Sequence, residues 1–124
     1  MQIRLKRVYD SPASGDGLRV LVDRVWPRGL RRSTARIDLW MKEIAPSPEL
    51  RKWFGHDPSR WQGFKEQYFC ELNQNGEKVK ELSDLVAKGK ITLLFGAKET
   101  RFNNAEALKE YLEKRASVAG TGKP

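Results

Sequence analysis

The chain has 124 residues, of which 39% are hydrophobic and 32% charged, and its formal net charge at pH 7 is +8. This size and composition predict one soluble, globular domain and exclude a largely disordered chain. No apolar run approaches the roughly 18 residues of a membrane-spanning helix, and the N-terminus lacks the apolar centre of a signal peptide, so we expect a cytoplasmic protein. The single cysteine, Cys70, excludes an internal disulfide and a cysteine-based zinc site.

The first half of the chain predicts two or three strands. Residues 3–8 alternate in hydrophobicity, as expected of a strand with one face toward the core, and residues 10–17 are rich in turn formers. Residues 18–22 form a mostly apolar run, which indicates a strand buried on both faces. Residues 37–44 favour a short third strand, although Trp40 interrupts the alternation and leaves a helix open.

The second half predicts helices around one further strand. Ser47 before Pro48 is typical of a helix start and Gly55 of its end, so we expect a helix over residues 48–54. Apolar residues at spacings of three and four then predict two longer helices up to residue 89. The later elements are a central strand over residues 91–95 and a last helix that begins after two asparagines.

This order of elements predicts a small single α/β domain over residues 1–115, with a short, mostly parallel central sheet flanked by helices. We expect the strands at residues 18–22 and 91–95 to lie centrally and parallel in this sheet. Residues 116–124 are polar and contain glycine, and we expect a disordered C-terminal tail there.

Basic residues gather near the predicted end of the second strand. Residues 1–54 hold twelve Lys and Arg against six Asp and Glu, and residues 24–36 hold five arginines and no acid. Ligands of parallel α/β sheets bind beyond the carboxyl ends of the strands, and Arg grips phosphate or carboxylate with a planar fork. We therefore expect Arg24 and Arg28 to bind an anionic ligand, while the more distal arginines are exposed to solvent.

Three side chains near this position are candidates for acid–base chemistry. Asp23 is either a general base, a group that orients a ligand hydroxyl, or a carboxylate held by a neighbouring Arg to close the turn. Glu43 is a candidate second carboxylate beside it. His56, the one histidine, is either a proton shuttle or a loop residue that makes hydrogen bonds. Trp26 either stacks on a ligand or packs in the core.

The connection between the last strand and the last helix is a second candidate anion site. A strand, a small-residue turn and a helix N-terminus together offer backbone N–H groups and a favourable dipole. Lys98 and Arg101 would add positive charge there. Either Asn103 or Asn104 caps the helix, and we expect the other to contact a ligand.

Four ordered motifs resemble those of a known family. They are residues 18–29 (LRVLVDRVWPRG), 38–47 (DLWMKEIAPS), 50–58 (LRKWFGHDP) and 92–98 (TLLFGAK), with Asn103-Asn104-Ala105 downstream. Over residues 3–112 the chain resembles the short, YeaO-like branch of the domain-of-unknown-function 488 family. The resemblance implies a compact α/β protein of the bacterial or archaeal cytoplasm and no assigned activity. Longer relatives carry a Cys and a His/Cys-rich loop after the last strand, and this chain has neither there.

From the residues we expect a protein that binds or processes an anionic, phosphorylated or nucleotide-like small molecule, without a metal or another cofactor. Whether a reaction is catalysed, and the oligomeric state, stay open. The alternative is a nucleic-acid-binding or regulatory protein that uses the arginines of residues 24–36. Because no basic recognition helix is evident, nucleic-acid binding should be weak and nonspecific.

Overall fold

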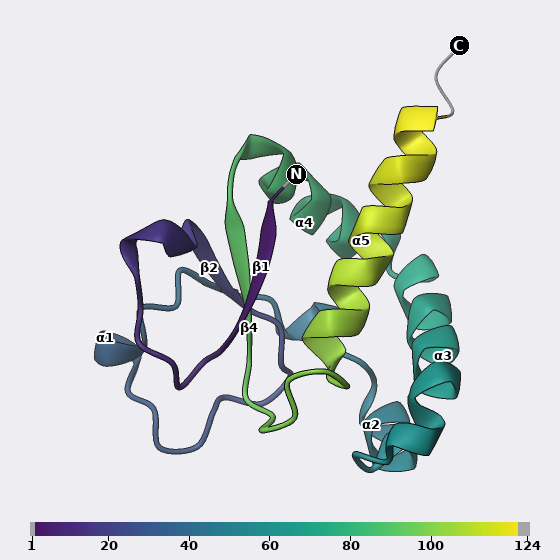
Figure 1. The fold of residues 1–124 in the computed structure, drawn as a ribbon, viewed down its shortest axis with the longest axis horizontal. Helices are drawn as coiled ribbons and strands as arrows, with labels where there is room; N and C mark the ends of the chain where they lie inside the picture. The colour runs from purple at the N-terminus through teal and green to yellow at the C-terminus, as the bar shows by residue number, and fades with distance from the viewer. Residues whose placement is uncertain (1, 122–124) are drawn as a thin grey trace.

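The computed structural model describes residues 2–121 and has a four-stranded, all-parallel sheet (Figure 1). Its strands, in the order β1-β4-β2-β3, are β1 (Ile3–Arg7), β4 (Ile91–Phe95), β2 (Leu18–Leu21) and β3 (Leu39–Trp40). The two strands expected at the centre of the sheet, β2 and β4, pair with each other there in parallel, as predicted. The chain is therefore an α/β protein with the expected central strands.

In the described residues, four α-helices and three short 3-10 turns lie in the connections between the strands, and a fifth α-helix follows the last strand. The helices are α1 (Arg32–Ala35), α2 (Pro48–Phe54), α3 (Trp61–Asn73), α4 (Gly76–Lys88) and α5 (Asn104–Thr121), and the turns are η1 (Ser14–Asp16), η2 (Lys42–Ile44) and η3 (Pro58–Arg60). No helix within the described residues is both long and apolar enough to cross a membrane.

The short helix α2 has the limits that its sequence predicts. The Ser47 hydroxyl accepts a hydrogen bond from the Leu50 N–H at 3.2 Å, and Gly55 ends the helix in the left-handed conformation with φ 53°. The predicted strand over residues 37–44 is shorter in the structure, because only Leu39 and Trp40 pair with β2 before the chain turns into η2. Helix α5 continues to Thr121, past the expected boundary at residue 115; residues 122–124 of the predicted tail lie outside the described residues.

The sheet is covered on both faces by different parts of the chain. Ile91, Leu93 and Phe95 of β4 pack into the main core with the helices α2 to α5, which lie together to one side of the sheet in Figure 1, whereas α1 lies at the other side. The alternate residue Leu94 belongs to a second cluster, formed with Val8 and Leu21 and with the half-buried side chains of Trp26, Leu30, Ile37 and Trp40. All five residues of β4 are buried, which explains why four of them are apolar; the hydroxyl of the fifth, Thr92, donates to the Asp16 carbonyl at 2.7 Å.

A buried ion pair ties the second strand to α1. Arg19 is only 4% exposed, and its guanidinium donates to the Asp16 carboxylate and to the backbone carbonyls of Ala35 and Arg36. Burial would raise the pKa of Asp16, but hydrogen bonds from the Ala13 N–H, Lys6 and Arg19 outweigh burial and lower the pKa to about 2. The pair therefore positions the segment between β2 and β3.

Candidate ligand pocket

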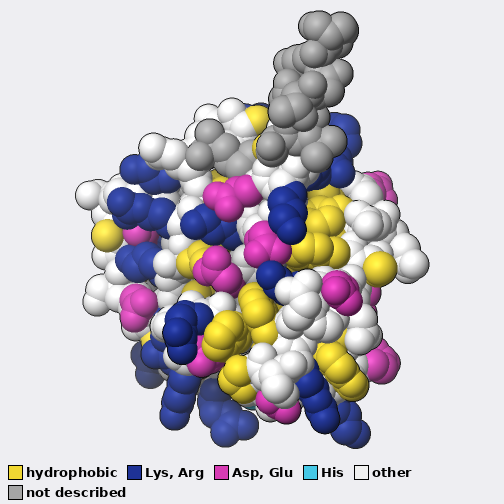
Figure 2. Space-filling model, turned by 45° about the vertical axis from the view of Figure 1, so that its right-hand side comes forward, with side chains coloured by type: hydrophobic (Ala, Val, Ile, Leu, Met, Phe, Trp, Pro, Cys, Tyr) yellow, Lys and Arg dark blue, Asp and Glu magenta, His cyan; other side chains and the backbone are white. Residues whose placement is uncertain are grey.

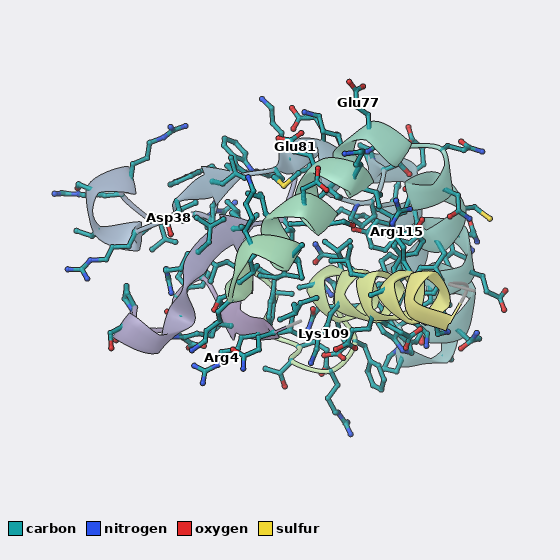
Figure 3. The ribbon with its side chains drawn as sticks, turned by 90° about the horizontal axis from the view of Figure 1, so that it is seen from above. Arg4, Asp38, Glu77, Glu81, Lys109 and Arg115 are labelled. Atoms are coloured by element: carbon teal, nitrogen blue, oxygen red, sulfur yellow. The ribbon has the colours of Figure 1, made fainter. Side chains whose placement is uncertain are left out.

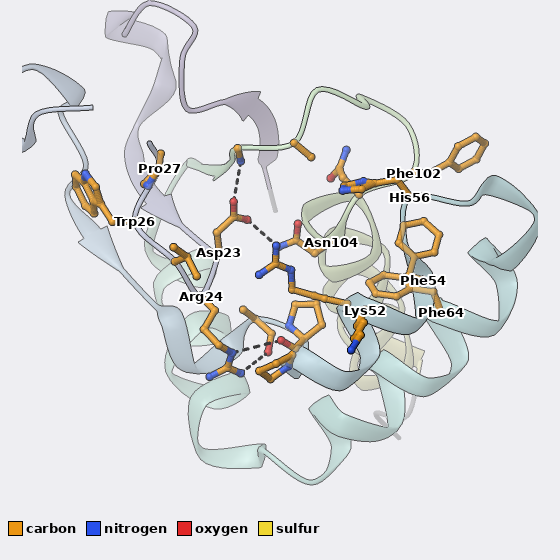
Figure 4. Close-up of a pocket in the computed structure, with 18 of the residues that line it drawn as sticks. Asp23, Arg24, Trp26, Pro27, Lys52, Phe54, His56, Phe64, Phe102 and Asn104 are labelled. Carbon is orange, nitrogen blue, oxygen red and sulfur yellow. Dashed lines mark hydrogen bonds between the residues drawn. The ribbon is translucent and has the colours of Figure 1, made fainter. Parts of the chain in front are cut away.

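A pocket of about 630 Å³ lies at the carboxyl ends of the strands (Figure 4). A segment beyond each strand contributes to its wall: Tyr9 beyond β1, Asp23 beyond β2, Ala45 beyond β3 and Gly96 beyond β4. Helix α2 forms a further wall. This is the place where parallel α/β sheets bind ligands, and the volume is within the usual range for small-molecule sites.

Asp23 is fixed at the base of this site by two other segments. Its Oδ2 accepts a hydrogen bond from the Gly96 N–H at 2.8 Å, and its Oδ1 accepts one from Asn104 Nδ2 at 3.1 Å (Figure 4). A Cβ atom on Gly96 would lie 3.2 Å from Oδ2, so a glycine permits this close approach. Burial raises the pKa of Asp23, and the bonds from Gly96 and Asn104, together with the positive charge of Arg51, oppose that rise.

The two adjacent asparagines have separate tasks. The Asn103 side-chain oxygen accepts from the Glu106 N–H at 2.9 Å, which caps the first turn of α5. Asn104 Nδ2 donates both to Asp23 and to the Val22 carbonyl, at 3.1 Å each. Both residues line the pocket. Capping thus accounts for Asn103, as expected for one of the pair, and Asn104 orients the carboxylate.

Arg24 also lines the pocket, but its guanidinium is engaged by the protein. Its Nη2 donates to the Ala45 carbonyl at 3.1 Å and its Nε to the Pro46 carbonyl at 3.5 Å. These bonds hold the segment before α2 against the end of β2. Arg24 therefore shapes the wall of the site.

Three other cations of the pocket wall are available for a ligand. Arg28, Arg51 and Lys52 line the pocket and are exposed. Within residues 2–121, the structure shows no hydrogen bond or ion pair from their side-chain nitrogens; Arg28 is contacted through its carbonyl by the Tyr9 hydroxyl at 2.9 Å. Sequence reasoning found Arg28 and missed Arg51 and Lys52. Arg51 and Lys52 lie on the short helix α2, where the sequence carries no signal that separates a pocket-lining cation from a solvent-exposed one.

Aromatic side chains complete the lining of the pocket. The two that the sequence predicts, Trp26 and His56, differ in how far they are engaged by the protein. Trp26 packs against Trp40 with ring centroids 5.4 Å apart and donates its indole N–H to the Leu30 carbonyl, so it joins the second core cluster while it lines the pocket. His56 lines the pocket, is exposed, and has a positive φ of 58°. The remaining aromatic residues of the wall are Tyr9, Phe54, Phe64 and Phe102.

Three of the predicted site residues are not among those that line the pocket. Glu43 lies on η2 and is exposed, and its carbonyl accepts a hydrogen bond from Asn75. Lys98 is exposed in the connection after β4, and the Arg101 guanidinium lies 5.2 Å from the ring of Phe102. The described residues contain no group of three or more His, Cys, Asp or Glu side chains placed to hold a metal ion.

Comparison with known proteins relates the whole chain to one family. The family model described as "Inactive DUF488-N3 subclade" matches residues 2–123. The "Uncharacterized protein YeaO" of Escherichia coli K12 is 46% identical over 112 residues, which cover 90% of this chain and 97% of that protein. The "Uncharacterized protein Rv3073c" of Mycobacterium tuberculosis H37Rv is 36% identical over 114 residues, which cover 92% and 96% of the two chains. No solved structure matches. The chain belongs to the domain-of-unknown-function 488 family, in the subclade whose description is inactive.

Proposed function

We propose that the pocket binds a small molecule that carries both an anionic group and a hydroxyl or amino group, and that it holds this molecule without transforming it. The observation that carries the proposal is the joint presence of Asp23 with Arg28, Arg51 and Lys52 in one pocket wall. Because these cations make no ion pair within the described residues, their charge is available to an anion from solvent.

The two chemical halves of the ligand follow from the donors and acceptors. A guanidinium presents several N–H donors and no acceptor, so Arg28 and Arg51 suit a phosphate or carboxylate. Each Asp23 oxygen accepts one N–H from the protein and keeps capacity for another bond. A ligand O–H or N–H beside Asp23 would use that capacity. A phosphorylated molecule with free hydroxyl groups satisfies both halves.

Binding without turnover is favoured by two observations. The family model that matches the chain describes its subclade as inactive. In the described residues no hydrogen bond connects His56 with Asp23, so the two candidates for proton transfer do not form a coupled pair. Burial accounts for the raised pKa of Asp23, and the hydrogen bonds from Gly96 and Asn104 oppose that rise.

The test is a calorimetric titration with ribose 5-phosphate, using ribose as the probe that lacks the anionic group. We expect binding of ribose 5-phosphate and none of ribose at the same concentrations. Arg28→Ala should weaken binding by about 1.5–3 kcal/mol, the usual value of a charge-assisted hydrogen bond. Lys98→Ala, which removes an exposed cation outside the pocket wall, is the matched control and should leave binding unchanged. Equal binding by the wild-type protein and Arg28→Ala, or no binding of any phosphate ester, would contradict the proposal.

A further inference from the structure

We propose that the exposed arginines around α1, which are Arg31, Arg32 and Arg36 and are called the arginine surface below, bind the phosphate backbone of nucleic acid independently of its sequence. None of the three residues lines the pocket, although Arg32 packs over Trp26, which does. The arginine surface lies in the connection between β2 and β3, and α1 stands at the outer edge of the molecule, away from the helices α3, α4 and α5 (Figure 1).

The positive charge of this surface is not neutralised by the protein. All three arginines are exposed, and no ion pair in the described part of the chain includes any of them. Residues 24–36 contain no acidic residue, and Asp38, the nearest acid that follows, accepts a hydrogen bond from the Arg19 N–H at 2.8 Å. Long side chains that end in nitrogen extend outward around this region, beside Asp38 in Figure 3.

The helical side of the molecule is built differently. There, Lys65 and Lys114 both pair with Glu110, and Lys80 pairs with Asp84. Basic and acidic side chains are interspersed over the centre of the face shown in Figure 2. Part of the net charge of +8 that no ion pair of the described residues offsets therefore lies at the arginine surface.

The arginine surface is also held in position. The buried Arg19 guanidinium donates to the Ala35 and Arg36 carbonyls, which fixes the end of α1 against β2. The guanidinium of Arg32 lies 4.9 Å from the ring centroid of Trp26 and 6.0 Å from that of Trp40. Side chains and backbone held in this way lose less conformational entropy when they bind a rigid array of charges.

The composition of the surface favours nucleic acid over a lipid membrane. All three cations are arginines, which bind phosphate oxygens in two places at once. Ser33 and Thr34 lie between them and Ala35 is buried, so α1 presents no apolar side chain for insertion into lipid. Helix α1 has only four residues, too few to read bases along a groove, so the contacts are to the backbone and carry no sequence preference.

The experiment measures fluorescence anisotropy of labelled 20-nucleotide single strands and duplexes of random sequence, at salt concentrations from about 50 to 200 mM. The test protein is Arg31→Gln/Arg32→Gln/Arg36→Gln. Its matched control is Lys80→Gln/Lys88→Gln/Lys114→Gln, which removes three exposed charges from α4 and α5. Circular dichroism checks the fold of both, and if the triple arginine variant does not fold, Arg31→Gln/Arg32→Gln replaces it.

We expect the arginine variant to bind nucleic acid at least about tenfold more weakly than the wild-type protein at low salt. The slope of its log affinity against log salt should be smaller in magnitude by about 2 to 3 units. The affinity of the lysine variant should stay within about twofold of that of the wild-type protein. The arginine variant should still bind ribose 5-phosphate as the wild-type protein does, and Arg28→Ala, the pocket variant, should retain more nucleic-acid binding than the triple arginine variant. An equal loss in both triple variants, no nucleic-acid binding at about 50 mM salt, or binding only to phosphatidylserine-containing vesicles would overturn the proposal.

Discussion

At the scale of single residues, the pKa of Asp23 is set by two opposing effects, burial and hydrogen bonding. Its position after the central strand β2 buries the carboxyl, and burial disfavours the charged form. Its two hydrogen bonds, from Gly96 and Asn104, favour the charged form but do not fully compensate, so the pKa is raised. A partly buried carboxyl group with a raised pKa that lines a pocket is a feature of binding sites.

The raised pKa of Asp23 predicts how stability changes with pH. The fold prefers the protonated carboxyl, so the contribution of Asp23 to stability is complete below its unfolded pKa of about 3.9 and is lost as the pH rises through the higher folded pKa. The Asp23→Asn variant does not titrate there. The free energy of unfolding of the wild-type protein minus that of the variant should therefore fall as the pH rises from about 4. Urea unfolding of both proteins from pH 4 to 8 measures this difference; a difference that is constant, or that increases with pH, would contradict the assignment.

Site residues that follow a strand or begin the last helix could be predicted from the sequence, and those on α2 could not. Asp23 and Arg28 come after an apolar run, so the topology alone places them at the carboxyl edge of the sheet. Arg51 and Lys52 face the pocket only because α2 packs across that edge. On so short a helix, two basic residues that line a pocket have the same sequence pattern as two that face solvent. Glu43 was expected beside Asp23, but the turn η2 leaves it exposed and outside the pocket wall.

At the level of elements, the ion pair of Asp16 with Arg19 connects η1, β2 and α1. Asp16→Asn would leave the Arg19 guanidinium buried without a compensating charge, so we expect a loss of about 3–5 kcal/mol in the free energy of unfolding at pH 7. Because the pKa of Asp16 is lowered to about 2, its stabilising contribution is complete above the unfolded pKa of about 3.9 and is lost as the pH falls toward 2.

Denaturant unfolding at pH 7 and at successively lower pH tests this prediction. The matched control is Asp84→Asn, which removes an exposed partner of Lys80 and should cost less than about 1 kcal/mol. The difference in the free energy of unfolding between the wild-type protein and Asp16→Asn should become smaller as the pH is lowered. A loss at pH 7 no greater than that of the control would show that the pair does not stabilise the connection.

Gly17, in the connection from η1 to β2, makes a second prediction at this level. Its φ is 66°, and a Cβ atom there would lie 2.3 Å from the Lys90 carbonyl oxygen. Gly17→Ala should therefore lower the free energy of unfolding by more than about 1 kcal/mol. Gly76→Ala, at the first position of α4 with open space around it, should be neutral or stabilising. Thermal unfolding measures the melting temperatures of the two variants. Equal melting temperatures of Gly17→Ala and Gly76→Ala would contradict the close approach of Gly17 to Lys90, the residue before β4.

The main helices and strands could be predicted from the local sequence. Their first and last residues could be predicted only where capping residues mark the ends. The β2 and β4 sequences predict buried central strands because they lack alternation, and Ser47 with Gly55 marks both ends of α2. The extent of β3 was not predictable, because the Trp40 indole N–H donates to the Asp23 carbonyl at 2.7 Å, a contact between segments distant in sequence. Only the tertiary structure shows why the pairing there ends after two residues.

At the scale of the whole molecule, the sheet brings together groups that are far apart in the chain. Asp23, Arg51, Gly96 and Asn104 belong to four segments that meet at one end of the sheet. The basic charge beside β2 divides into two places, the pocket wall and the arginine surface. We therefore expect small anions and nucleic acid to bind at different positions.

The most direct test of the central claim is amide chemical-shift mapping of the ¹⁵N-labelled protein during titration with ribose 5-phosphate. The Gly96 N–H donates to Asp23, so its resonance reports on any ligand that contacts the carboxylate. We predict saturable shifts of the amide resonances of Gly96, Asn104 and Arg51 and no shifts in α1. Shifts confined to residues 31–36, or no saturable shift at Gly96, would contradict a ligand site at the carboxyl ends of the strands.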